Sequence, residues 1–193
     1  MQKYNVSFVG YDLVGKTTLL LTYKEKKLPD GTNPFYDSNF TKKYEIENKE
    51  FEIEFWDTRI PDYDKLTPLI YIGRDVIAIC FAVDNPYSFE KVKDFWIPDI
   101  EKHSPKSKRI LIATKMDLRN NEKRKYELKE ENKELITKEE GIELAMKIKA
   151  IKYFECSSLN QKGIETIFNE IPLVCIGKYG EQKQIEKKGC ILN

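Results

Sequence analysis

The chain has 193 residues, of which 40% are hydrophobic and 34% are charged, and its formal net charge is +1. This length suits one domain with a substantial core, and a charge so close to zero favours neither nucleic acid nor a membrane surface as a partner. The sequence has no run of eighteen apolar residues, so we expect no helix that spans a bilayer. Its four cysteines, Cys80, Cys156, Cys175 and Cys190, lack the spacing of a disulfide framework or a zinc site, which favours a reducing, cytosolic compartment.

Residues 10–17 have the spacing G-x-x-x-x-G-K-T, which is typical of a loop that binds phosphate. Alternating residues 4–9 predict a strand before the loop, and residues 18–23 can continue as a helix after it. Gly10 and Gly15 allow backbone conformations that other residues avoid, so that N–H groups can converge on phosphate oxygens. Lys16 would contact the outer phosphates. The alternative is an ordinary glycine turn between a strand and a helix.

The next segments predict a β-hairpin between two loops. Residues 41–48 and 50–57 alternate in polarity, and Asn48 with Lys49 could form the turn between them. Residues 26–40 and 58–70 lack periodicity and contain proline, so we expect two loops, the second with a helical turn.

The second half alternates strands and helices. Residues 75–83 are almost continuously apolar, as in a buried central strand. A helix is predicted over 86–102, with Asn85 as its cap and Pro86 in its first turn. Further strands are predicted over 109–113 and 153–156, and helices after Thr137, which forms a capping box with Glu140, and over 163–170. This alternation predicts an α/β fold with a largely parallel sheet.

Three polar motifs follow predicted strands. Asp57 can reach Mg²⁺ through water, Asp117 can accept two hydrogen bonds from the edge of guanine, and a backbone N–H near Ser157 and Ser158 can meet the guanine carbonyl. With the charged insertion at about 119–136, these motifs resemble the Rho/Rac-like branch of the Ras superfamily of small GTPases. The resemblance implies a three-layer P-loop GTPase fold with a six-stranded, mostly parallel sheet, one antiparallel edge strand and a Rho-type insert helix. It implies a GTPase domain over 1–176 and a flexible tail over 177–193.

The resemblance also implies GTP or GDP with Mg²⁺ as cofactors, and Thr17 and Asp57 around the metal. The implied nucleotide-binding residues are Asp12, Leu13, Val14, Gly15, Lys16, Thr17, Thr18, Lys115, Asp117, Leu118, Ser157 and Ser158. Effector proteins, exchange factors and a guanine dissociation inhibitor are the implied partners of a monomer that does not bind nucleic acid. Signalling to the cytoskeleton is the implied role.

The tail has the pattern of a prenylation site. Cys190 is the fourth residue from the end and is followed by Ile191 and Leu192, although Asn193 is an uncommon last residue. One lipid beside a tail of net charge +2 is marginal for stable anchoring. We therefore expect reversible attachment to the cytoplasmic face of membranes, in particular the plasma membrane. An unmodified tail cysteine is the alternative.

Several residues depart from the family pattern where GTP is hydrolysed. Asp12 replaces a glycine of the phosphate loop, Phe35 replaces the threonine that binds Mg²⁺ in the triphosphate state, and Ile60 and Pro61 replace the glycine and glutamine that serve the third phosphate and the attacking water. These changes predict weak or absent hydrolysis. The hydroxyls of Thr32, Ser38 or Thr41 could replace that of the lost threonine only after a shift in register.

Three further residues bear on the site or on the last helix. Leu28 replaces an aromatic residue at the base edge. Arg59 could act as a cis arginine or lie on the surface without a catalytic role. Pro172 should kink or end the last helix.

Three functions are considered for a chain with these motifs. The chain could be a signalling GTPase that cycles between nucleotide states, or a binding module that holds nucleotide mainly for stability and is regulated by abundance or location. A phosphate-loop kinase for small molecules is disfavoured, because Asp117 favours guanine.

Overall fold

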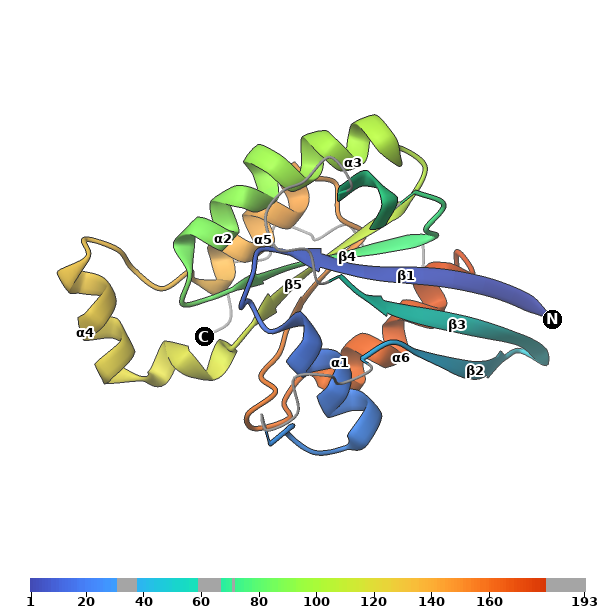
Figure 1. Cartoon of the computed structure of the whole chain (residues 1–193), viewed down its shortest axis with the longest axis horizontal. Helices are drawn as coiled ribbons and strands as arrows, with labels where there is room; N and C mark the ends of the chain where they lie inside the picture. The colour runs from blue at the N-terminus through green and yellow to red at the C-terminus, as the bar shows by residue number, and fades with distance from the viewer. Residues whose placement is uncertain (31–37, 59–66, 71, 180–193) are drawn as a thin grey trace, which may run out of the picture.

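A six-stranded sheet lies between two layers of helices in the computed structural model, which describes residues 1–30, 38–58, 67–70 and 72–179 (Figure 1). Across the sheet the strands follow the order β2-β3-β1-β4-β5-β6. The β2–β3 pair is antiparallel and the other pairs are parallel, which confirms the predicted fold class. The strands are β1 (Gln2–Gly10), β2 (Phe40–Ile46), β3 (Lys49–Asp57), β4 (Val76–Ala82), β5 (Lys108–Thr114) and β6 (Lys152–Glu155).

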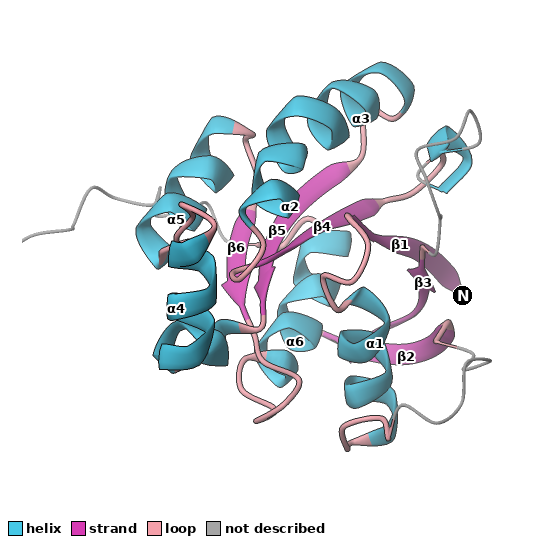
Figure 2. Cartoon of the chain, turned by 60° about the vertical axis from the view of Figure 1, so that its left-hand side comes forward, coloured by secondary structure: helices cyan, strands magenta, loops and turns pink. Residues whose placement is uncertain are grey.

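The helices divide between the two faces of the sheet (Figures 1 and 2). α1 and α6 cover one face, α2, α3 and α5 cover the other, and α4 projects beyond the sheet. The helices are α1 (Lys16–Glu25), α2 (Pro86–Lys91), α3 (Ile97–His103), α4 (Glu122–Glu130), α5 (Lys138–Lys147) and α6 (Ile164–Cys175), with short turns η1 (Thr67–Ile70), η2 (Val92–Trp96) and η3 (Met116–Asn120). Within the described residues, no helix combines the length and apolar character needed to cross a bilayer.

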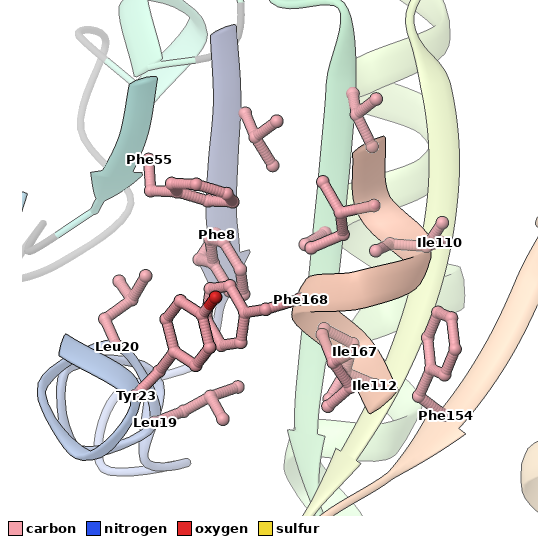
Figure 3. Packing of buried hydrophobic residues seen from close by; sticks show 14 of the residues in the cluster. Phe8, Leu19, Leu20, Tyr23, Phe55, Ile110, Ile112, Phe154, Ile167 and Phe168 are labelled. Carbon is pink, nitrogen blue, oxygen red and sulfur yellow. The ribbon is translucent and has the colours of Figure 1, made fainter. Parts of the chain in front are cut away.

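Aromatic side chains fill the core on the α1 and α6 face. The ring of Phe168, from α6, stacks on that of Tyr23, from α1, with 3.8 Å between their centroids (Figure 3). Phe8 of β1 and Phe55 of β3 also contact Phe168, at 5.9 and 5.3 Å. All seven residues of β4 are buried, as expected for a central strand with helices on both faces.

The last helix does not stop at Pro172, one of the two outcomes predicted there, but continues to Cys175. Proline lacks the N–H that would normally bond to the carbonyl of Phe168, four residues earlier. In this fold the hydroxyl of Tyr44 donates to that same carbonyl over a distance of 3.5 Å. The ammonium of Lys108 caps the C-terminus of this helix, since it donates to the carbonyls of Val174 and Cys175 at 3.0 and 2.9 Å. Tertiary contacts therefore replace the hydrogen bond that the proline removes.

Two other local predictions need correction. The hairpin turn lies at Glu47 and Asn48, both at positive φ (52° and 60°), one residue before the predicted turn. The helix predicted over 86–102 extends to His103 but contains a π-helical turn at η2, where the N–H of Ile97 bonds to the carbonyl of Val92. Pro98 follows this turn and cannot donate to the ladder, so the chain widens just before it.

The predicted caps are confirmed, and a helix is present in the insertion. The side chain of Asn85 accepts a hydrogen bond from the N–H of Ser88 at 3.1 Å, and Thr137 and Glu140 form the capping box. The insertion contains α4, whose cap is Asn121. The tail beyond residue 179, with Cys190, lies outside the described residues.

Candidate functional site: a nucleotide-binding edge of the sheet

The loop from Gly10 to Gly15 joins β1 to α1 in a conformation that requires glycine at both ends. Gly10 has a φ of 145°, and a β-carbon there would lie 2.2 Å from the carbonyl oxygen of Cys80 in β4. Gly15 is the N-cap of α1 with a φ of 98°, and it has no side chain that could accept from the N–H groups of the first turn. A phosphate can therefore approach these N–H groups and the positive end of the helix dipole.

Lys16 lies inside this loop rather than in solvent. Its side chain is buried, and its ammonium donates to the carbonyls of Gly10 at 2.8 Å and Tyr11 at 3.0 Å. Burial lowers the pKa of this ammonium, although the nearby carboxylates of Asp57 and Asp12 act in the opposite direction. A buried lysine of lowered pKa in a glycine loop is a feature of functional sites, because a bound anion would supply the missing negative charge.

Two hydroxyls and a carboxylate meet beside the loop. The hydroxyl of Thr17 donates to Oδ2 of Asp57 at 2.5 Å, and the hydroxyl of Ser38 donates to the same oxygen at 2.7 Å. Asp57 is the last residue of β3, and Asn39 accepts a hydrogen bond from its backbone N–H at 2.7 Å. Oxygen ligands of this kind suit Mg²⁺, which usually takes one or two carboxylates together with substrate phosphates. The structure thus brings the two predicted metal residues together with Ser38, a hydroxyl that the sequence analysis considered only after a shift in register.

The predicted base-binding residues follow β5 and β6. Lys115 adopts a left-handed conformation (φ 56°) that turns the chain into η3, which contains Asp117 and Leu118. The N–H of Met116 donates to the carbonyl of Cys156 at 3.0 Å, so the two loops are tied together. Ser157 is fully buried, with its hydroxyl accepting from the N–H of Asn160 at 3.3 Å, which orders the loop that continues into Ser158.

Thr114 connects the base end of the site to the phosphate end. Its buried hydroxyl, at the end of β5, contacts the carbonyl oxygen of Val14 in the phosphate loop and the carbonyl oxygen of Phe81 in β4. The carboxyl ends of β1, β4, β5 and β6 meet at this edge of the sheet, which is where open α/β sheets bind ligands. Among the predicted nucleotide-binding and metal-binding residues, all of which the structure describes, Asp12 and Leu13 are the exposed ones, and Leu13 is 90% exposed.

Sequence reasoning missed Asp84, which follows β4 at the same edge. Its carboxylate is buried between two cations, with Nζ of Lys115 at 3.5 Å and Nε of Arg124 at 3.2 Å. Arg124 belongs to α4 and also donates to the backbone carbonyl of Asp84 at 3.0 Å. The signal available in the sequence was the position of this aspartate, directly after an apolar strand whose neighbours end in site residues.

A second group of charges holds the loop after β6. The guanidinium of Arg119 lies 2.7 Å from Oε1 of Glu155, and the hydroxyl of Tyr153 donates to the same oxygen at 2.7 Å. Burial alone would raise the pKa of Glu155, but the contacts with Arg119 and Tyr153 outweigh it and leave this pKa below its ordinary value. Glu155 therefore remains ionised and links the insertion to the strand that leads into Ser157 and Ser158.

Five residues expected to bear on hydrolysis lie outside the described residues, so their predicted effects stay predictions. They are Thr32, Phe35, Arg59, Ile60 and Pro61. Leu28, at the position expected to stack on the base edge, is described and is 40% exposed.

Taken together, the described residues fit a nucleotide with its metal. One end offers a glycine loop, a helix N-terminus and a buried lysine for phosphates, and beside it lie a carboxylate and two hydroxyls for a hard cation. The other end offers Asp117 and the loop after β6 for a base. The family model described as Ras family matches residues 5–175 of the chain, a span that includes every one of these residues. The chain therefore belongs to the Ras family and is a small GTP-binding protein.

Proposed function

We propose that this protein is a Rho-like signalling protein that binds GTP and GDP with Mg²⁺ and hydrolyses GTP weakly. Nucleotide binding is supported by the connection between the two ends of the site. The Thr114 hydroxyl contacts the phosphate loop, and the loops after β5 and β6 are hydrogen-bonded to each other. The Rho-like part rests on the charged insertion that forms α4 and on the motifs of the sequence.

Weak hydrolysis is proposed from the residues that replace the usual machinery. Catalysis of phosphoryl transfer is mainly positioning and stabilisation of charge. Pro61 has neither a side-chain amide nor an N–H to orient water, and Ile60 has a branched side chain where a close backbone approach to the third phosphate is needed. Asp12 adds negative charge near the phosphates. Mg²⁺, when bound, would neutralise phosphate charge, and Thr17 and Asp57 are the residues that would hold it.

Guanine specificity is tested first, by titration calorimetry of the nucleotide-free protein with GDP and ADP. The paired oxygens of Asp117 match the donors of guanine, and a site built on such hydrogen bonds discriminates by about 10⁴. Asp117→Ala should reduce this preference. Equal affinity of the parent protein for GDP and ADP would contradict the guanine assignment.

Hydrolysis is tested by single-turnover assays of pre-loaded GTP, with and without a Rho-type activating protein. Such activators supply roughly 10³–10⁵ in rate where they act through an arginine, and we expect little stimulation here. Restoring glycine at positions 12 and 60, glutamine at 61 and threonine at 35 together should raise the rate. Stimulation of the unaltered protein by a thousandfold would show that Arg59 or another group has replaced the missing machinery.

The second candidate is a nucleotide-insensitive binding module, favoured by the same altered residues because they fall on the parts that respond to the third phosphate. The two candidates differ in the ratio of GTP to GDP affinity and in effector binding. A module would bind its partners equally in both nucleotide states, whereas a switch would prefer one.

Partners and location complete the proposal. Effectors, exchange factors and a dissociation inhibitor are proposed from the Rho-like motifs, and prenylation of Cys190 from the last four residues. Intact-mass analysis of the protein from its native cells should show a lipid and a trimmed tail. A free Cys190 with the tail uncut would contradict membrane attachment by this route, and with it the proposed cytoplasmic-face location.

A further inference from the structure

Ser38 lies where the metal site of the proposed function lacks a residue. With Phe35 in place of the usual threonine, the first loop has lost its expected Mg²⁺ ligand. In the structure the side chain of Ser38 is 4% exposed and its hydroxyl donates to Oδ2 of Asp57 at 2.7 Å. The hydroxyl of Thr17, the other predicted ligand, donates to that same oxygen at 2.5 Å.

The position of Ser38 follows from the pairing of two strands. β2 and β3 are antiparallel with Phe40 opposite Phe55 and Thr41 opposite Glu54. Two more residues in this register place Ser38 opposite Asp57. Asn39 holds this arrangement, because its side-chain oxygen accepts from the backbone N–H of Asp57 at 2.7 Å. No shift of register is therefore needed for Ser38 to reach the metal site.

The two hydroxyls converge on one oxygen of Asp57. The distances from this oxygen to the Thr17 and Ser38 hydroxyls are 2.5 and 2.7 Å, so a cation bound to both hydroxyls would lie close enough for Asp57 to reach it through water. Each hydroxyl donates its proton to Asp57, and a hydroxyl oxygen that donates its proton can still bind a cation through its lone pairs. A nucleotide bound at the neighbouring phosphate loop would supply further oxygens through its phosphates.

We propose that the Ser38 hydroxyl is a direct Mg²⁺ ligand, in place of the threonine that Phe35 replaces. This inference rests on the proposed function, since the metal would be bound together with a guanine nucleotide. It differs from the family pattern in an important respect: the ligand comes from a residue fixed to the end of β3 through Asn39 and Asp57. Metal ligation by the first loop would then depend less on which nucleotide is bound.

The test measures the release of a fluorescent GDP or of a non-hydrolysable GTP analogue at a series of free Mg²⁺ concentrations. Ser38→Ala should raise the Mg²⁺ concentration that slows release by half by about tenfold or more. Loss of a group that only orients a metal ligand typically costs 10–100-fold in metal affinity, and loss of a direct ligand should cost at least as much. Thr41→Ala, an exposed hydroxyl three residues on, is the matched control and should change this concentration by less than twofold.

A thiol at position 38 separates direct ligation from support of Asp57. In Ser38→Cys, Mg²⁺ should slow nucleotide release poorly, whereas a thiophilic ion such as Cd²⁺ should restore slow release, because soft thiolates prefer softer metals. Thr41→Cys, which also retains Cys190, controls for other thiols, and the cysteines that the structure describes, Cys80, Cys156 and Cys175, are buried. Rescue confined to Ser38→Cys supports the proposal.

Two results would overturn the inference. An unchanged Mg²⁺ requirement in Ser38→Ala would show that Ser38 is not needed, and weaker Mg²⁺ binding without rescue by Cd²⁺ in Ser38→Cys would show that it only positions Asp57. Both leave the proposed function intact. Failure of the unaltered protein to bind either guanine nucleotide would instead overturn the proposed function itself.

Discussion

Replacing Pro172 by alanine should stabilise the protein, although the residue is buried in the core. Proline within a helix is about 3 kcal/mol less favourable than alanine. The alanine would lose two buried carbon atoms, which costs about 1.6 kcal/mol at about 0.8 kcal/mol each. The hydroxyl of Tyr44 already recovers about 1 kcal/mol of the proline penalty by donating to the carbonyl of Phe168. The net gain is then about 0.4 kcal/mol, and for a chain of this size the melting temperature should rise by about 1–2 °C.

The assay is thermal unfolding followed by circular dichroism, at one fixed nucleotide concentration because bound ligand also stabilises. Tyr44→Phe supplies the matched comparison, since it removes the hydroxyl that donates to the carbonyl of Phe168. It should cost about 1 kcal/mol in the parent and less in Pro172→Ala, where the new N–H can bond to that carbonyl. A lower melting temperature for Pro172→Ala would refute the reasoning and show that ring packing outweighs the backbone term.

Three other changes test the candidate site. Asp84→Asn should speed GDP release about two- to fivefold, because it weakens the ion pair with Lys115 in the loop predicted to bind the base. Asp94→Asn, which changes an exposed aspartate, should leave GDP release unchanged in the same fluorescence assay. Arg119→Gln should move acid unfolding to higher pH. Because the pKa of Glu155 is lowered in the folded protein, its carboxylate stabilises the fold above the unfolded pKa, and this stability is lost as pH falls through the folded pKa. Without the guanidinium the folded pKa is higher, so the loss begins at a higher pH. Gly163→Ala should cost at least about 2 kcal/mol in urea titrations, because φ is 76° and the new β-carbon would lie 2.1 Å from the carbonyl oxygen of Glu155.

The sequence predicted the architecture because local signals and tertiary contacts agree over most of it. The apolar run of β4, the capping box at Thr137 and the glycine loop each favour locally the structure that the fold also requires. Pro172 is different. Its local preference favours a helix end, and contacts from Tyr44 and Lys108, far away in the chain, support the continuation. Such compensation cannot be read from residues near the proline.

The site was predicted in part for a similar reason. Motif residues such as Lys16 and Asp117 are identified by spacing along the chain. Asp84 and Ser38 have no motif, and their positions depend on which strands are neighbours and on the register between β2 and β3. Once the sheet is known, both follow from simple geometry.

The stacking of Phe168 on the first strand and helix has a consequence for synthesis of the chain. The rings of Phe8 and Tyr23 are made early, but the ring that covers them belongs to α6, and 160 residues separate Phe8 from Phe168. At translation rates of 5–20 residues per second, about 8–30 s pass before the covering helix exists. During this interval the emerging chain exposes an aromatic surface, and we expect chaperones that bind apolar segments to associate with it on the ribosome until α6 is released.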